Sequence, residues 1–338
     1  MIIVLKPNLS KKEESAVIAE IRKLGYTPHI MRGVERTVIG AIGDERQNPS
    51  LEPLAMWPQV ESVTPVQKRY KLISRGAPPK DSTVILPGGL VLGGRKLHVM
   101  AGPCSVEGED QLFRTAEAVA AAGATVLRGG AFKPRTSPYE FQGLGEKGLK
   151  LLAKARKRTG LAVITELLSE TQAELVAEYA DILQIGARNA QNFQLLIAAA
   201  KTGRPVLLKR GLSMKIEEWL LAGEYVLAHG NRNVLFCERG IRTFETYTRN
   251  TLDLAAVPII KRETHLPVVV DPSQGAGRAD LVTALCKGAV AMGADALLIE
   301  VHPNPAEAWS DGAQQLTLGG FARLMAELQP FIAAAGRE

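Results

Sequence analysis

The sequence lacks any stretch that is long and apolar enough to cross a membrane, and it has few cysteines. No run among its 338 residues approaches the roughly 18 apolar residues that a membrane helix needs. The amino terminus, Met1–Lys6, has neither the basic region nor the longer apolar core of a signal peptide. Three cysteines, Cys104, Cys237 and Cys286, cannot build a disulfide framework and indicate a reducing compartment. We therefore expect a cytoplasmic protein that has no membrane partner.

The net charge is also small, and nucleotide-binding motifs are absent from the sequence. The chain carries 41 Lys and Arg against 35 Asp and Glu, and the resulting charge of +6 is too small to indicate nucleic acid. It is compatible with anionic metabolites. No Gly-x-Gly-x-x-Gly follows a candidate strand and no Walker sequence is present, which argues against dinucleotide-binding and P-loop proteins. Apolar residues still make up 46% of the chain, enough for a substantial core.

Residues 1–70 predict a small ferredoxin-like domain. Ser10 and Glu13 form a capping box before apolar residues at helical spacing, and Gly25 ends this helix. Four strands and a second, short helix complete the order βαββαβ, at Ile2–Lys6, Thr27–Met31, Arg36–Ile42, Ser50–Trp57 (the helix) and Val60–Val66. A module of this kind, joined to a larger domain, is more often regulatory or oligomerising than catalytic.

A linker is expected over residues 71–81, where Gly76 and the Pro78-Pro79 pair lie, and a short apolar hairpin at Thr83–Leu86 and Leu90–Leu92 follows it. Residues 82–338 then repeat a short apolar strand, a polar loop and a helix. The strands are expected at Leu97–Ala101, Thr125–Arg128, Ala162–Thr165, Ile182–Ile185, Val206–Leu208, Val234–Cys237, Val268–Val270 and Ala296–Ile299. Eight such units, with strands apolar on both faces, predict an α/β fold, a (β/α)8 TIM barrel.

In such a barrel the functional site lies at the carboxyl ends of the strands, and basic residues gather there. They are Arg128, Lys133, Arg135, Arg188, Lys209 and Arg239. Six cations on one rim would repel one another unless strong anions bound there, and Arg and Lys suit phosphate and carboxylate oxygens. The pattern favours a polyanionic, phosphorylated small molecule over a merely solvated edge.

A second group at the same strand ends consists of Cys104, Glu300 and Asp311, with His302 nearby. A thiolate and two carboxylates can bind a divalent metal and leave positions open for a substrate oxygen. Each residue also has a simpler interpretation. Cys104 could be a small buried apolar residue, the acids could be counter-ions for the arginines, and His302 could hydrogen-bond its own loop.

The loops at the strand ends resemble those of 3-deoxy-7-phosphoheptulonate (DAHP) synthases, which are transferases. The subgroup most similar is the type I beta-like one with a ferredoxin-like, ACT-like amino-terminal domain, and the resemblance covers nearly the whole chain. The matching segments are Ala101–Ser105, Leu127–Pro138, Gly186–Asn189, Leu208–Gly211, Glu238–Arg242 and Glu300–Pro303. The block Arg-Gly-Gly-Ala-Phe-Lys-Pro-Arg-Thr-Ser-Pro within the second segment is the most specific of them.

The resemblance implies an aldol-type condensation of phosphoenolpyruvate with erythrose 4-phosphate, the first step of the shikimate pathway to aromatic amino acids. Lys133 and Cys104 are the catalytic residues that it implies. The residues implied for phosphoenolpyruvate are Lys133, Arg188, Lys209 and Arg239, supported by Arg128, and those for erythrose 4-phosphate are Lys133, Arg135 and Thr136. A divalent metal (Mn, Fe, Co, Zn or Mg) would polarise the aldehyde oxygen.

The metal site is where the chain departs from the family pattern. The family's ligands map to Cys104, position 274, Glu300 and Asp311, and Gln274 stands where His is expected. An amide oxygen is a harder and weaker ligand than imidazole and suits Mg²⁺, Mn²⁺ or Ca²⁺ better. Three outcomes stay open: a weaker site with a changed metal preference, a reaction without metal, or a reaction that is altered or lost.

Several alternatives follow from these features. The chain could use another phosphosugar, or it could be a silent relative that binds an aromatic amino acid or a partner protein. For the small domain, the resemblance implies feedback by tyrosine or phenylalanine within a homotetramer. The plain alternative is a domain that only assembles the oligomer.

Overall fold

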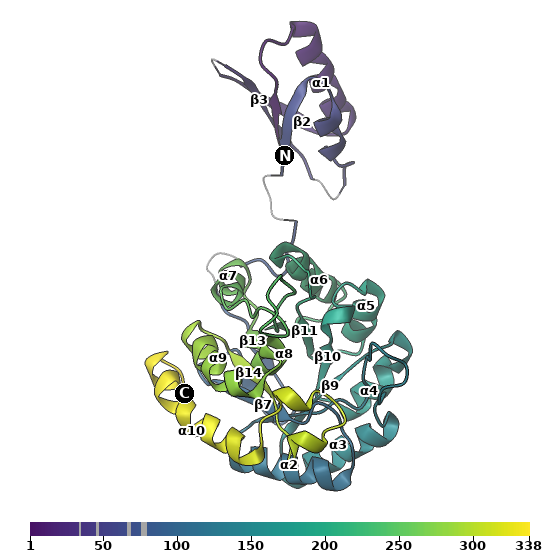
Figure 1. Ribbon diagram of the computed structural model, residues 1–338. Helices are drawn as coiled ribbons and strands as arrows, with labels where there is room; N and C mark the ends of the chain where they lie inside the picture. The colour runs from purple at the N-terminus through teal and green to yellow at the C-terminus, as the bar shows by residue number, and fades with distance from the viewer. Residues whose placement is uncertain (34, 45–46, 66–68, 76–79) are drawn as a thin grey trace. The chain divides into compact units, whose positions relative to one another are not determined.

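The computed structural model describes residues 1–33, 35–44, 47–65, 69–75 and 80–338 (Figure 1). The chain divides into two compact units, Met1–Arg69 and Tyr70–Glu338. Three of the residues on which the linker prediction depends, Gly76, Pro78 and Pro79, lie outside the described part, as does the predicted strand end at Val66. Within the described part, no helix combines the length and apolarity needed to cross a membrane.

The first unit is a four-stranded antiparallel sheet with an α-helix and a short 3-10 helix, in the βαββαβ order that the ferredoxin-like prediction gives. Its strands β1 (Ile2–Leu5), β2 (Thr27–Arg32), β3 (Thr37–Ile42) and β4 (Val60–Thr64) run in the order β2-β3-β1-β4. Helix α1 (Lys11–Lys23) begins with the predicted capping box, in which the Glu13 carboxylate accepts from the Ser10 amide at 2.8 Å. The helix buries Val17, Ile18 and Ile21 in the core of this unit.

The second helix of this unit differs from the prediction. In place of a helix over 50–57, a single 3-10 helix spans Glu52–Met56. Pro53 in its first turn has no amide hydrogen to donate, and Trp57 already has extended backbone angles. The segment is therefore long enough for one tight turn only, which is held to the core through the buried Leu51 and Leu54.

The second unit contains the predicted closed barrel of eight parallel strands (Figure 1). Its strands are β7 (His98–Gly102), β8 (Val126–Arg128), β9 (Ala162–Glu166), β10 (Ile182–Ile185), β11 (Val206–Lys209), β12 (Val234–Glu238), β13 (Val268–Val270) and β14 (Ala296–Glu300). The helices are α2 (Glu109–Ala121), α3 (Glu146–Thr159), α4 (Ala173–Tyr179), α5 (Phe193–Lys201), α6 (Ile216–Ala228), α7 (Ala256–Glu263), α8 (Pro272–Ala276), α9 (Ala279–Ala291) and α10 (Leu318–Ala334).

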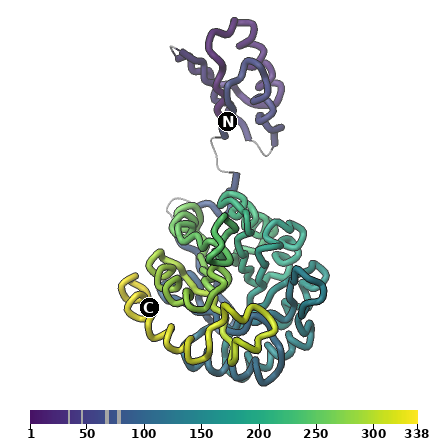
Figure 2. Tube along the Cα trace, viewed as in Figure 1, coloured from purple at the N-terminus to yellow at the C-terminus, as the bar shows by residue number. Residues whose placement is uncertain are grey.

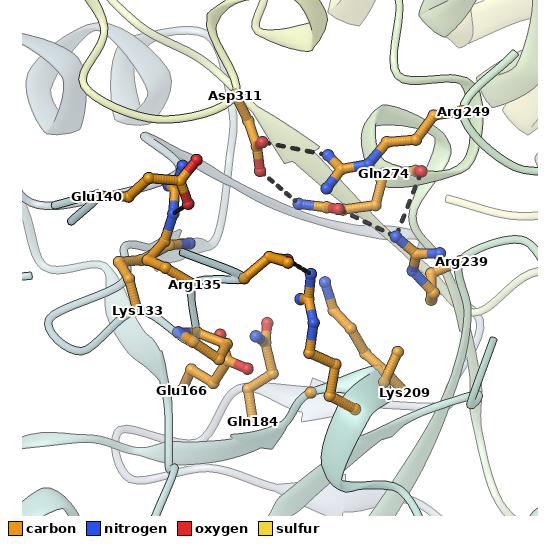
Figure 3. Close-up of a pocket in the computed structure, with 15 residues that line it drawn as sticks. Lys133, Arg135, Glu140, Glu166, Gln184, Lys209, Arg239, Arg249, Gln274 and Asp311 are labelled. Carbon is orange, nitrogen blue, oxygen red and sulfur yellow. Dashed lines mark hydrogen bonds and ion pairs between the residues drawn. The ribbon is translucent and has the colours of Figure 1, made fainter. Parts of the chain in front are cut away.

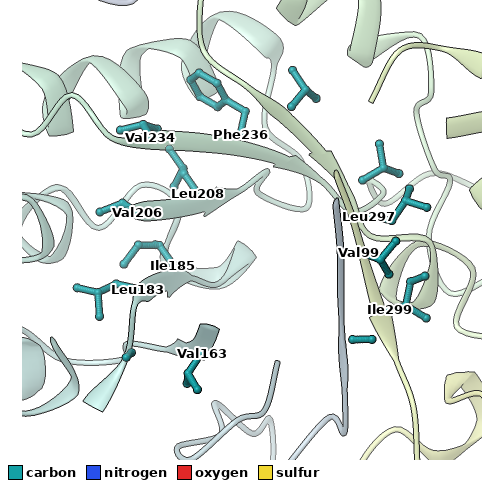
Figure 4. Packing of buried hydrophobic residues seen from close by; sticks show 14 of the residues in the cluster. Val99, Val163, Leu183, Ile185, Val206, Leu208, Val234, Phe236, Leu297 and Ile299 are labelled. Atoms are coloured by element: carbon teal, nitrogen blue, oxygen red, sulfur yellow. The ribbon is translucent and has the colours of Figure 1, made fainter. Parts of the chain in front are cut away.

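Successive residues of each barrel strand point into two different cores. Leu207 and Leu235 belong to the cluster inside the barrel, whereas their neighbours Leu208 and Phe236 belong to the cluster between strands and helices. Figure 4 shows part of this outer cluster, with Leu208 and Phe236 beside each other on adjacent strands. Burial on both faces explains why the strands are apolar at nearly every position.

The short hairpin closes the barrel at the end where the strands begin. Its strands β5 (Val84–Ile85) and β6 (Val91–Leu92) supply Val84 and Leu92 to the interior cluster, and Leu86, directly after β5, also belongs to it. The segment before it is held near the start of β13, since the Ser82 amide donates to the His265 carbonyl at 2.7 Å. At the end of the chain, α10 packs against α2 and α9, so that the trace returns to the first barrel helix (Figure 2). The opposite end of the barrel is left for the functional site.

Removing the hairpin's contribution to the core should destabilise the protein. Leu92 is 1% exposed, so Leu92→Ala should lower the free energy of unfolding by about 2–5 kcal/mol through lost burial and a residual cavity. Val91→Ala is the matched control, because Val91 is 38% exposed and its loss should cost under about 1 kcal/mol. Urea unfolding followed by circular dichroism measures both, and equal losses would contradict the hairpin's contribution to the barrel core.

Candidate active site

Five barrel strands end on a charged residue, and their carboxyl ends meet at one rim. The five residues are Arg128, Glu166, Lys209, Glu238 and Glu300. All five are at least 90% buried, so these charges must be paired with one another or with charges from the loops. The rim surrounds a cavity of about 230 Å³ (Figure 3).

The cavity is lined by most of the residues that the sequence suggested for anion binding. Those on its wall are Lys133, Arg135, Thr136, Arg188, Lys209 and Arg239. Two positions predicted for the metal site, Gln274 and Asp311, line it as well. Within the described residues, Arg188 has no carboxylate at ion-pair distance, and its closest polar partner is the Thr136 hydroxyl at 3.4 Å. Its guanidinium is therefore available to an anionic ligand in the cavity.

Lys209 is held at the wall by a buried ion pair. Its Nζ lies 2.6 Å from Asp271 Oδ2, while Asp271 Oδ1 accepts from the backbone amide of Gln274 at 2.9 Å. Asp271 is thus the N-cap of α8 and Pro272 its first residue, an arrangement that favours a helix start. One carboxylate therefore fixes both the lysine and the helix that carries Gln274.

Arg239 is fixed by the turn that follows β12. The Glu238 carboxylate accepts from the Gly240 amide at 2.6 Å, and Gly240 has φ +89°, a conformation that side chains rarely adopt. A Cβ at Gly240 would also lie 2.7 Å from the Cβ of Asn250. The turn directs the Arg239 guanidinium toward Gln274, whose Oε1 accepts from it at 3.1 Å.

Cys104, Glu300 and Asp311 converge beside the cavity as a possible metal group. One ligand atom from each residue lies within 4.8 Å of the others. Each is already next to a cation: Lys133 Nζ is 3.1 Å from Cys104 Sγ, and Arg128 donates to Glu300 at 2.9 Å. Arg128 is not among the residues that line the cavity, and the substrate contact expected of it stays a prediction.

Asp311 is the third member of this group, and its cationic neighbour is Arg249 at 3.2 Å. Burial opposes its ionisation, but Arg249, Lys133 and hydrogen bonds from Cys104 and Gln274 lower the pKa of Asp311 to about 2. Burial and the neighbouring carboxylates raise the pKa of Cys104 to about 11, although Lys133 opposes this. Without a metal, the acid is therefore ionised and the thiol protonated, and the thiol donates to Asp311 at 3.3 Å.

The donor set fits a divalent metal with three protein ligands. A soft thiol and two carboxylates are ordinary ligands of first-row metals. His302 is not a replacement for the missing imidazole, because both of its ring nitrogens are occupied. The Asn304 amide donates to Nδ1 at 3.1 Å, so Nε2 carries the hydrogen and faces Glu107 at 3.2 Å.

Arg249 is a cavity residue that the sequence reasoning did not select. It lies in the loop between β12 and α7 and contacts Asp311 and also Gln314, whose Oε1 is 3.0 Å away. Gln314 in turn donates to Glu300 at 2.6 Å. Neither Arg249 nor Gln314 directly follows a strand, so their positions in the sequence do not predict a place in the site.

The fold and the site together are those of a TIM-barrel protein with a cavity lined by cationic side chains at the carboxyl ends of its strands. Two family models match the sequence: the DAHP synthetase I family over residues 82–333 and the DAHP synthase ferredoxin-like domain over residues 1–68. The chain therefore belongs to the DAHP synthetase I family of aldol-type synthases.

Individual relatives agree with this assignment. A phospho-2-dehydro-3-deoxyheptonate aldolase of Thermotoga maritima is 51% identical over 336 residues, which is 99% of either chain. The crystal structure of a Thermotoga maritima DAHP synthase has a TM-score of 0.94 and 49% identity, and the match covers 100% of this chain and 98% of that one. A 2-dehydro-3-deoxyphosphooctonate aldolase of Nitrobacter winogradskyi is 34% identical and covers 76% of this chain and 96% of its own.

Breaking the Lys209–Asp271 pair should leave a buried cation without its partner. Asp271→Asn keeps an oxygen for the helix cap but removes the charge, and it should lower the free energy of unfolding by about 3–5 kcal/mol. Glu327→Gln, which breaks the exposed pair with Lys287, should cost no more than about 1 kcal/mol. Urea denaturation of the ligand-free protein compares the two, and similar losses would refute this role for Asp271.

Proposed function

We propose that the cavity condenses phosphoenolpyruvate with erythrose 4-phosphate and releases phosphate. The observation that carries this proposal is the set of cationic side chains converging on one cavity beside Cys104, Glu300 and Asp311. C3 of phosphoenolpyruvate attacks the aldehyde carbon, one water adds at C2, and the resulting phosphohemiketal collapses with loss of phosphate. The site's task is to hold two mutually repelling anions in attack geometry.

The proposed roles follow from where the cations lie. Lys209, Arg188 and Arg239 bind the phosphate and carboxylate of phosphoenolpyruvate, since all three line the cavity. Figure 3 shows Lys209 and Arg239 on the same side of it. Arg135 and Thr136 bind the phosphate of the aldehyde substrate. Arg135 is oriented by Glu140, whose Oε2 accepts from its Nε at 2.9 Å.

Lys133 lies between the cavity and Cys104 and is the proposed acid of the condensation. Its neighbours Cys104 and Glu166 raise the pKa of Lys133 although burial opposes this, so the amine stays protonated. A buried ammonium can donate to the aldehyde oxygen as negative charge develops there. Cys104, Glu300 and Asp311 would hold a divalent metal, which supplies Lewis-acid polarisation of the same oxygen when bound.

Replacing Lys133 tests this proposal. Lys133→Met should lower the rate of phosphate release from phosphoenolpyruvate and erythrose 4-phosphate about 100- to 1,000-fold, because the developing charge loses its donor. Lys150→Met is the control, since Lys150 is exposed on α3 and pairs only with nearby Glu146 in the described structure. Phosphate release is measured over a series of divalent metals. No release by the wild type under any metal would refute the proposal in favour of a silent relative.

The same phosphate-release assay distinguishes the proposed reaction from condensation with a five-carbon sugar phosphate. Relatives that carry the phosphooctonate name are 31–34% identical and cover about 70% of this chain, so a five-carbon sugar is the specific rival. Under the proposal, erythrose 4-phosphate outcompetes arabinose 5-phosphate. Preference for the latter would reassign the substrate.

We propose further that the amino-terminal unit is regulatory, binding tyrosine or phenylalanine within a homotetramer of a cytoplasmic enzyme. Its match to the ferredoxin-like domain model and its separate core support an independent role. The three free, buried cysteines support a reducing compartment. A truncated form of the Thermotoga enzyme has been solved and matches 80% of this chain with a TM-score of 0.75, so deletion has a precedent.

Deleting residues 1–69 should separate regulation from catalysis. The whole chain should be inhibited at least about fivefold by one of the two amino acids, and the piece 70–338 should lose this response while keeping turnover. Initial rates with and without effector, together with sedimentation equilibrium, measure both properties. A whole chain that forms tetramers but ignores both amino acids would reduce the domain to an assembly role.

A further inference from the structure

The amide of Gln274 has different chemical surroundings at its two ends. Its Nε2 lies 3.1 Å from Glu300 Oε1 and 3.3 Å from Asp311 Oδ2, which are both acceptors. Its Oε1 lies 3.1 Å from Nη2 of Arg239, which can only donate. Figure 3 shows the side chain lying between Asp311 and Arg239. The partners therefore determine which end of the amide is nitrogen: it faces the acids.

The backbone of Gln274 is held in place as well. Its amide nitrogen donates to Asp271, the N-cap of α8, and its carbonyl oxygen accepts from Asn250 Nδ2 at 2.9 Å. Nη2 of Arg239 approaches the same carbonyl at 3.5 Å. The side chain thus starts from a fixed point between the acids and the arginine.

This orientation is wrong for a metal ligand. A cation among Cys104, Glu300 and Asp311 would face an amide NH₂ group, which has no free lone pair for it. Turning the amide to present its oxygen would place the NH₂ group against the Arg239 guanidinium, donor against donor. Rotating the amide would also break the charge-assisted hydrogen bond from Arg239 to the Gln274 oxygen.

We propose that Gln274 is a hydrogen-bonded bridge between Arg239 and the two carboxylates and not a fourth ligand. The metal group then has three protein ligands, and a metal displaces the bridge when it binds. Because Arg239 is also a proposed phosphate-binding residue, Gln274 links the metal group to the phosphoenolpyruvate side of the cavity. The inference deepens the proposed function, on which it rests for the role of the metal, but its test needs no turnover.

The three residues of the metal group should stay in place when the Gln274 side chain is removed. Each of the three ligands has a cationic neighbour of its own: Lys133 for Cys104, Arg128 for Glu300 and Arg249 for Asp311. Gln274→Ala therefore leaves no buried carboxylate without a cation, and the group should keep its arrangement.

Metal titration of the whole chain distinguishes a bridge from a ligand. Chelator-treated wild type, Gln274→Ala and Gln274→His are titrated with Co²⁺, and thiolate-to-cobalt charge-transfer absorption reports binding at Cys104. Under the proposal, Gln274→Ala binds Co²⁺ within about threefold of the wild type or more tightly, because no ligand is lost. Gln274→His binds at least about tenfold more tightly, because it adds an imidazole. Gln329→Ala, on α10 away from the site, is the matched control.

Two results would overturn the proposal. A tenfold or greater loss of Co²⁺ affinity in Gln274→Ala would make the amide a ligand. Absence of Co²⁺ binding by both wild type and Gln274→Ala, with binding by Gln274→His, would show that three ligands do not suffice. Gln274→Leu, of similar size but without polar ends, repeats the comparison if the alanine variant does not fold. Phosphate release is assayed separately, so an inactive protein with the expected Co²⁺ pattern refutes the proposed reaction and leaves the bridge standing.

Discussion

The site depends on the pairing of buried charges at the carboxyl ends of the strands. Cations gathered at one rim of a low-dielectric barrel would repel one another and favour unfolding unless anions lay between them. The protein supplies those anions itself: Asp271 for Lys209 and Glu300 for Arg128. In the loops above them, Asp311 pairs with the more exposed Arg249. Arg188 is left without a carboxylate partner among the described residues and faces the cavity. The protein can thus keep a cationic cavity assembled without a bound anion.

The same carboxylates also shape the backbone around the site. Asp271 caps α8, and Glu238 accepts from the amide of Gly240 in the turn that positions Arg239. Each is buried, so an unmet hydrogen bond or an unpaired charge there would be costly. Charge neutralisation and loop conformation are therefore coupled, and a substitution of either acid disturbs both.

Much of the fold could be predicted from the residues because the signals are local. The capping box at Ser10 and Glu13 and the apolar runs of the eight strands depend on neighbours in sequence, and the structure contains both. The short helix expected over 50–57 is present but shorter, as a 3-10 helix over Glu52–Met56, since Pro53 and the extended Trp57 limit the segment. Arg249 went unnoticed for a different reason: it reaches Asp311 from a long loop, and no spacing rule connects the two.

By itself, the sequence determined the barrel, the ferredoxin-like unit and the set of basic residues at the strand ends, because these follow from apolar periodicity and from the order of strands and loops. It also showed that Gln274 stands where the family has His. What the amide does there was decided only by the tertiary structure. Which end of an amide is the nitrogen depends on its partners, and those partners, Arg239, Glu300 and Asp311, come from three separate parts of the chain.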